Sequence, residues 1–117
     1  MQFNIAHPDI KLSPNYHAHW TKKHAAKKQA QHEGYYLAKT IKHSLTPQCR
    51  LKAVVSVSKN HKGHYDIDNI MASLKPFLDG LFKGLKLNDE QIDIIVVKKL
   101  HDTKWHGVMF TLERIVA

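Results

Sequence analysis

The sequence predicts an α+β fold (mixed α/β) in which two helices pack on a mixed sheet of about four strands, in the order β-α-β-α-β-β. Short β-branched runs that alternate every second residue mark the strands. A lysine- and alanine-rich stretch and a leucine stripe at helical spacing mark the helices. The strand-helix-strand succession also favours some parallel pairing through a right-handed crossover. We expect residues 1–117 to form a single domain, because the chain is too short for two cores.

The first half of the chain is expected to hold a strand, a long helix and a second strand. Residues 2–7 alternate, with Phe3 and Ile5 on one face, which predicts the opening strand. After a loop with two prolines, residues 18–45 are rich in Lys, Ala and Gln and poor in helix breakers. We expect a long helix there, with one face on the sheet and its lysines toward solvent or a partner. Residues 51–59, LKAVVSVSK, alternate as a strand.

The second half is expected to hold the other helix and two more strands. Apolar residues recur at spacings of four and three, which predicts a helix that Pro76 should kink or divide. Residues 92–99 form a continuous β-branched run typical of a strand buried on both faces, and residues 107–115 alternate as the last strand. The apolar stripe of the helix consists of Ile67, Met71, Leu74, Leu78, Leu81 and Leu85.

Composition narrows the functional class. The chain has no run of about 18 apolar residues and no signal-peptide pattern, so we expect a cytoplasmic protein without membrane contact. Its single cysteine, Cys49, excludes an intramolecular disulfide and a multi-cysteine zinc site. A formal net charge of +8 favours a polyanionic partner, above all nucleic acid, and solubility alone is the alternative explanation.

The two signs of charge are separated along the chain. The carboxylates cluster between Asp66 and Asp93, whereas the predicted first helix has a single acid, Glu33. A basic surface beside an acidic pocket suits a metal-dependent phosphodiesterase, because the acidic part would repel the phosphates without a cation. Trp20 and Tyr16 could stack on a base, although aromatic residues of amphipathic helices more often join the core. The lysines of the first helix are Lys22, Lys23, Lys27, Lys28, Lys39 and Lys42.

Asp66, Asp68 and Asp89 are the candidate metal ligands. Asp66 and Asp68 lie at the start of the predicted second helix, where capping of unpaired amides is the alternative explanation. Together with Asp89 they could bind a hard cation, and Mg²⁺ takes one or two carboxylates plus waters and substrate phosphate. Lys75 could stabilise charge on the reacting phosphate, or it could simply pair with Asp79 four residues on.

Three segments resemble the RusA-type Holliday junction resolvases, a family of crossover junction endodeoxyribonucleases common in phages and prophages. Residues 66–69, DIDN, are similar to the family's D-x-D-N signature at the start of a helix that leads to a lysine and an Asp-Gly pair. Residues 88–91, NDEQ, are similar to its D-D-x-Q segment, with Asn88 in place of the first aspartate. Residues 12–15, LSPN, resemble its proline-asparagine segment before the basic helix.

The resemblance implies a Mg²⁺-dependent, structure-specific endonuclease, with Mn²⁺ as a substitute ion. Such an enzyme resolves four-way DNA junctions by paired, near-symmetric cuts in recombination and repair. It implies a homodimer in the bacterial cytoplasm, encoded by the cell or by a phage or prophage, and no small-molecule substrate. Asp66, Asp68 and Asp89 would bind the metal and act in catalysis with Lys75.

Two further implications concern the lysine and the DNA contacts. In the best-known members the catalytic lysine follows the asparagine by three residues, where this chain has Ala72, and Lys75 lies one turn further along the helix. A catalytically silent junction- or duplex-binding protein is therefore an open alternative, and an RNA-directed nuclease or binding module is another. The expected DNA contacts are Asn15, Lys22, Lys23, Lys27, Lys28 and Asn69.

Overall fold

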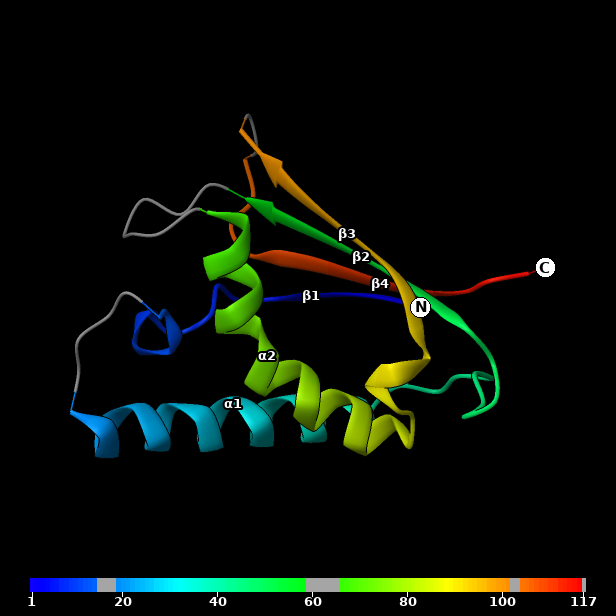
Figure 1. The fold of residues 1–117 in the computed structure, drawn as a ribbon, viewed down its shortest axis with the longest axis horizontal. Helices are drawn as coiled ribbons and strands as arrows, with labels where there is room; N and C mark the ends of the chain where they lie inside the picture. The colour runs from blue at the N-terminus through cyan, green and yellow to red at the C-terminus, as the bar shows by residue number, and fades with distance from the viewer. Residues whose placement is uncertain (15–18, 59–65, 102–103, 117) are drawn as a thin grey trace.

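The structure is a computed structural model, and it describes residues 1–14, 19–58, 66–101 and 104–116 (Figure 1). The predicted α+β class is confirmed, because the helices and strands follow one another in the order β-α-β-α-β-β. Two 3-10 turns, η1 and η2, were not predicted. The elements are β1 (Gln2–Ile5), η1 (Ile10–Leu12), α1 (Trp20–Lys39), β2 (Leu51–Ser58), α2 (Ile67–Leu85), η2 (Asp89–Gln91), β3 (Ile92–Leu100) and β4 (Val108–Arg114).

The four strands form one mixed sheet in the order β1-β4-β2-β3. The β4 strand is antiparallel to both β1 and β2, whereas β2 and β3 are parallel. Parallel neighbours need a crossover connection, and α2 supplies it between β2 and β3. Alternate residues of β2 and β4 are buried on the face toward the helices, including Val55, Val57, Phe110 and Leu112. The alternation that predicted these strands thus identifies their core face.

The prediction that residues 92–99 are buried on both faces is wrong. Among the described residues, the β3 strand pairs with β2 alone and forms an edge of the sheet. Ile94 is 45% exposed and Ile95 is 52% exposed. Because consecutive residues point to opposite faces of a sheet, neither face of this strand is fully buried. A β-branched run shows a preference for extended backbone, and it does not show how far each face is covered.

The α2 helix lies against the sheet and supplies much of the core. Leu74, Leu81 and Leu85 of the predicted stripe are buried, while Ile67 at the start of the helix is 46% exposed. Pro76 lies inside the helix, which is one continuous element over Ile67–Leu85. The helix changes direction along its length (Figure 1), as expected where a proline removes a backbone hydrogen bond, but it is not divided into two.

The α1 helix ends earlier than predicted, and its main neighbour is α2. It ends at Lys39 rather than near residue 45, because the Thr40 hydroxyl donates to the carbonyl of Leu37 (2.7 Å) and the chain then turns so that Ile41 and Leu45 pack against the core. Its buried face lies mainly against α2. No helix in the part of the chain that the structure describes is long and apolar enough to cross a membrane.

Glycines allow α1 and α2 to touch backbone to backbone. A Cβ atom on Gly34 would lie 2.1 Å from the carbonyl oxygen of Phe77, and one on Gly80 would lie 1.9 Å from the carbonyl oxygen of Gln31. No real side chain fits such distances, so both positions require glycine. The buried stripe of α1 consists accordingly of small residues: Ala30, Gly34 and Ala38.

Candidate functional site

Asp66 and Asp68 lie at the amino end of α2. Asp66 occupies the N-cap position, with φ −77° and ψ 142°, but its side chain makes no capping hydrogen bond. One oxygen of Asp68 accepts from the backbone N–H of Asn69 at 3.0 Å. Both residues are exposed. The structure therefore does not support capping as the role of the Asp66 carboxylate, which lies at the end of the helix where the dipole favours negative charge.

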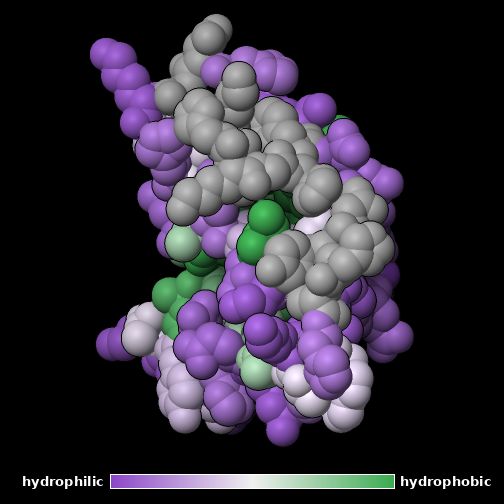
Figure 2. Space-filling view, turned by 90° about the vertical axis from the view of Figure 1, so that its left-hand side faces the viewer, coloured by the Kyte–Doolittle hydropathy of each residue, from purple (hydrophilic) through white to green (hydrophobic). Residues whose placement is uncertain are grey.

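The predicted DNA-binding lysines belong to the first turns of α1. Both α1 and α2 begin toward the left-hand side of the molecule in Figure 1. Figure 2 looks onto this side, where hydrophilic side chains cover most of the described surface and hydrophobic ones show in recesses between them. On α1, Lys22, Lys27 and Lys28 are exposed and Lys23 is half-buried. Helical spacing distributes these lysines around α1 rather than along one face.

Of the two asparagines predicted to contact DNA, the structure describes one. Asn69 is only 9% exposed, so little of its side chain could meet a nucleic acid. Asn15 lies outside the residues that the structure describes, as does Tyr16. Trp20, by contrast, is 70% exposed and does not join the core.

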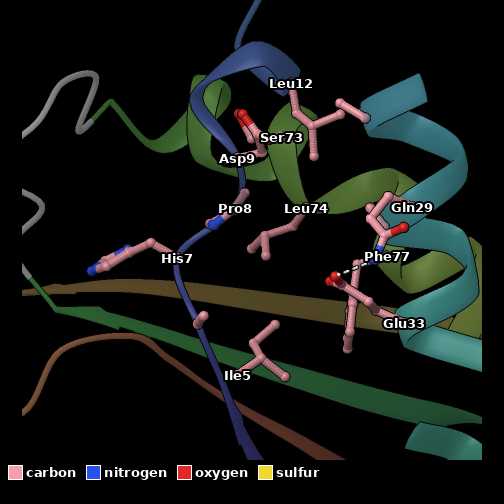
Figure 3. A pocket seen from close by; sticks show the side chains of 13 residues that line it. Ile5, His7, Pro8, Asp9, Leu12, Gln29, Glu33, Ser73, Leu74 and Phe77 are labelled. Carbon is pink, nitrogen blue, oxygen red and sulfur yellow. Dashed lines mark hydrogen bonds between the residues drawn. The ribbon is translucent and has the colours of Figure 1, made fainter. Parts of the chain in front are cut away.

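A cavity of about 300 Å³ lies between β1, η1, α1 and the first half of α2 (Figure 3). Its walls are largely apolar and include Ile5, Leu74 and Phe77. At its rim the amide of Gln29 donates to Glu33 at 3.0 Å. The ring of His7 points away from Leu74 in Figure 3.

His7 joins the end of β1 to the end of β2. Its Nε2 lies 3.1 Å from the hydroxyl oxygen of the buried Ser58, and that oxygen also accepts from the backbone N–H of Gly107 at 2.8 Å. Burial lowers the pKa of His7, and the nearby His106 lowers it further. The imidazole is therefore held in its neutral form more strongly than in an unfolded chain.

His7 should make the protein less stable in mild acid. A lowered pKa means that the folded protein binds this proton less readily than the unfolded chain, whose value is near 6.5, so protonation below that pH favours unfolding. We expect the thermal midpoint of the wild type to fall between pH 7.5 and about pH 5 by more than that of His7→Gln, which keeps an amide near Ser58. Parallel pH profiles of the two proteins would contradict this assignment.

Lys75, Asp79 and Asp89 form a second charged group further along α2. The Lys75 ammonium lies 3.1 Å from an oxygen of Asp79 and 3.6 Å from an oxygen of Asp89. The hydrogen bond to Asp79, and after it the charges of Asp79 and Asp89, raise the pKa of Lys75, so this residue is a fixed cation rather than a base. The Asp79 pair considered from the sequence is thus present, and Asp89 joins it.

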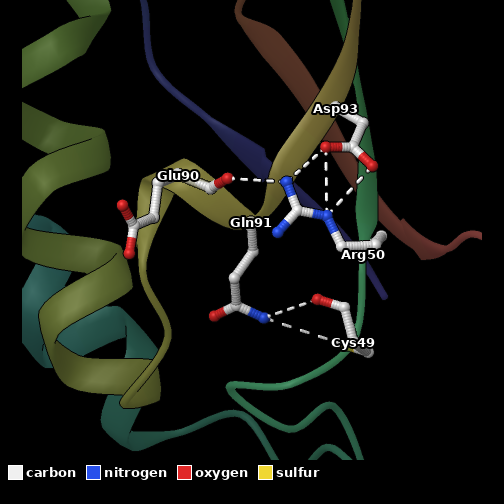
Figure 4. Close-up of polar contacts among 5 residues, drawn as sticks. All are labelled: Cys49, Arg50, Glu90, Gln91 and Asp93. Atoms are coloured by element: carbon white, nitrogen blue, oxygen red, sulfur yellow. Dashed lines mark hydrogen bonds and ion pairs between the residues drawn. The ribbon is translucent and has the colours of Figure 1, made fainter.

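The η2 turn, which carries Asp89, is fixed by Gln91 (Figure 4). This side chain is 3% exposed. Its oxygen accepts from the backbone N–H of Asn88, and its nitrogen donates to the carbonyls of Thr46 and Cys49, each bond being 2.8 Å long. Gln91 was matched as part of a motif but given no role, because only the fold shows that its amide faces the segment before β2.

Arg50 also fixes this turn. Its Nε donates to both oxygens of Asp93 at 3.0 Å, and its Nη2 donates to Asp93 and, at 2.9 Å, to the carbonyl of Glu90 (Figure 4). The hydrogen bond from Arg50 lowers the pKa of Asp93. Asp93 therefore belongs to an exposed, structural ion pair and not to the metal-binding candidates.

Replacing Gln91 by leucine should lower the free energy of unfolding by about 3 kcal/mol, because two carbonyls and one N–H lose their shared partner at a largely buried place. Urea denaturation would measure the loss. Glu90→Gln is the matched control, since it changes an exposed side chain in the same turn. A Gln91→Leu protein as stable as this control would show that water replaces the amide without cost.

The three candidate metal ligands come from two segments of the chain. Asp66 and Asp68 precede or begin α2, whereas Asp89 follows the end of this helix and contacts Lys75. Within residues 1–14, 19–58, 66–101 and 104–116, no three His, Cys, Asp or Glu residues form a group that could hold a metal. Asp66 and Asp68 alone still supply the one or two carboxylates that Mg²⁺ takes alongside waters and phosphate.

Comparison with known proteins gives one distant relative. The chain is 32% identical over 87 residues to a protein of Xylella fastidiosa (strain Temecula1 / ATCC 700964) whose name is "Uncharacterized protein". The aligned part covers 72% of this chain and 57% of the relative, so the chain spans little more than half of the relative's length. No protein-family profile matches the chain. No solved structure matches it either.

Proposed function

We propose that this protein is a metal-dependent, structure-specific DNA endonuclease of the RusA type, which resolves four-way junctions by paired cuts. One observation supports the proposal above the others. The carboxylate of Asp66 is not used for capping and lies one residue from Asp68, at the end of α2 on the side where the basic α1 also begins (Figure 1). A divalent cation held by these carboxylates would act together with the exposed lysines of α1, which attract phosphates.

Each residue has a distinct part in this proposal. Asp66 and Asp68 would hold the cation, and Mg²⁺ or Mn²⁺ held there would supply the Lewis-acid chemistry that phosphodiester hydrolysis needs. Exposed lysines of α1, Lys22, Lys27 and Lys28, would bind the DNA backbone. Lys75 would stabilise negative charge as a permanent cation, positioned by Asp79 and Asp89.

A four-way junction needs two matched cuts, and a two-fold symmetric enzyme provides them. We therefore include a homodimer with an isologous interface in the proposal.

The test is cleavage of a labelled four-way junction beside a linear duplex of the same sequence, with Mg²⁺, Mn²⁺ or EDTA. The proposal expects paired cuts in the junction, with either metal and not with EDTA. Cleavage of both substrates at equal rates, or cleavage in EDTA, would refute it. Structured RNA as a competitor would reveal an RNA-directed protein, because a resolvase should prefer the junction even as the salt concentration rises.

A second candidate is a catalytically silent protein that binds junctions or duplex DNA. It is favoured by the position of Asp89, which contacts Lys75 and forms no three-ligand group with Asp66 and Asp68 among the described residues. This candidate expects gel shifts of the junction without products under every metal.

A further inference from the structure

A second cavity, of about 440 Å³, lies where α1 crosses α2, away from the start of either helix. From α1 it is lined by His32, Tyr35 and Tyr36, and from α2 by Asp79 and Lys83. Neither tyrosine belongs to the core: Tyr35 is half-buried, and Tyr36 is 67% exposed. Two neighbouring aromatic rings at the surface of a basic helix are typical of a binding surface.

The rings form an open corner. The centroids of Tyr35 and Tyr36 are 5.6 Å apart, and their planes meet at 82°. The ring of His32 also lies near that of Tyr36, with centroids 6.5 Å apart and planes at 76°. Since neither ring is stacked face to face with its neighbour, a flat group could stack on Tyr36 and meet the edge of a second ring.

The charges around this corner favour an anion. The ammonium of Lys39 lies 4.9 Å from the centroid of the Tyr35 ring, and Lys83 lines the cavity from α2. The one carboxylate in the lining, Asp79, is paired with Lys75 at 3.1 Å, which reduces its repulsion of an anion. A flat aromatic surface between lysines suits a nucleotide, which offers a base for stacking and a phosphate for the cations.

We propose that Tyr36, with Tyr35 and His32 beside it, binds an unpaired base of DNA, and that Lys39 and Lys83 hold the neighbouring phosphates. This inference rests on the proposed function only in taking DNA as the partner, and it needs no step of the cleavage reaction. It adds a contact for the single-stranded or distorted part of a branched substrate. Stacking on an aromatic ring tolerates any base, so the contact would select for unpaired structure rather than for sequence.

The test compares a duplex that has a short single-stranded gap with the same duplex fully paired, with 2-aminopurine in the gap. Replacing Tyr36 by alanine should weaken binding of the gapped DNA by about 5- to 100-fold, measured by anisotropy, and remove the quenching of 2-aminopurine. Tyr36→Phe, which keeps the ring, should behave as the wild type. Affinity for the paired duplex should change by less than about twofold in both variants. Since Tyr36 is exposed, the thermal midpoint of Tyr36→Ala should stay near that of the wild type.

The outcomes separate this inference from the proposed function. If Tyr36→Ala binds gapped DNA as tightly as the wild type, the stacking site is refuted, while duplex and junction binding stand. If the wild type binds neither junction nor duplex nor gapped DNA, both the nuclease proposal and the stacking site fail. Tighter binding of single-stranded RNA than of DNA of the same sequence would overturn DNA as the occupant.

Discussion

Asp68→Asn should lower metal-dependent cleavage of a four-way junction by about 100-fold or more, which corresponds to a loss of about 2.7 kcal/mol of transition-state stabilisation. An amide removes the negative charge that would hold the cation, but its oxygen can still accept from the N–H of Asn69. The fold should therefore survive, with at most about 1 kcal/mol lost from the interaction with the helix dipole. The measurement is single-turnover cleavage in Mg²⁺ beside a denaturation curve of each protein.

Glu90→Gln is the matched control, because it makes the same carboxylate-to-amide change at an exposed position outside the candidate metal site. It should cut at the rate of the wild type. A fully active Asp68→Asn protein would remove Asp68 from the metal site, and the endonuclease proposal would then lose its main support. If Asp68→Asn is inactive because it no longer folds, Asp66→Asn provides the test instead. This second substitution removes a charge from the same site without breaking a capping hydrogen bond.

Gly80→Ala should destabilise the fold by about 3 kcal/mol, although alanine is the better helix former by about 1 kcal/mol. The added Cβ would lie 1.9 Å from the Gln31 carbonyl oxygen and 2.7 Å from its carbon. Both atoms belong to the backbone of α1, so the clash is relieved only if the helices separate and the core around Leu81 opens. Urea or thermal denaturation followed by circular dichroism would measure the effect.

Ala72→Leu is the control for this substitution, because Ala72 is exposed on the same helix and added bulk there meets solvent. Its free energy of unfolding should change by less than about 0.5 kcal/mol. Gly84→Ala should lie between the two, since its Cβ would lie 2.6 Å from the Cβ of Ala38 and 2.7 Å from the backbone oxygen of Tyr35, which is less close than the contact at Gly80. If Gly80→Ala were as stable as the wild type, the two helices would not cross as closely as described.

Periodicity was sufficient to predict which segments are helices and strands, because residues 51–58 and the stripe of α2 alternate between core and solvent as their sequence does. Periodicity was not sufficient to predict how distant segments pack against one another. Nothing in the β-branched run of β3 indicates that it pairs on one side only. The end of α1 was missed because residues 40–45 contain no breaker, and the helix stops there through the Thr40 hydroxyl and the packing of Ile41 and Leu45.

The candidate site was predictable only in its local parts. The position of Asp66 and Asp68 at a helix start follows from their place before an apolar stripe. The position of Asp89 does not, because this residue contacts Lys75, which lies seven residues after Asp68 and therefore about 10 Å further along α2. What directs Asp89 toward Lys75 is the anchoring of η2 by Gln91 and Arg50 to the segment before β2, and these contacts join residues 40 and 42 positions apart.

The close crossing of α1 and α2 also determines how freely the sequence can change. Residues 34 and 80 admit no side chain, so each accepts a single amino acid, whereas the exposed positions of the same helices can be replaced without disturbing the crossing. In a library of random variants sorted only for folded protein, substitutions should therefore gather on the lysine-rich surface of α1 and avoid these two glycines. The surface offered to a partner can then be altered independently of the scaffold that carries it.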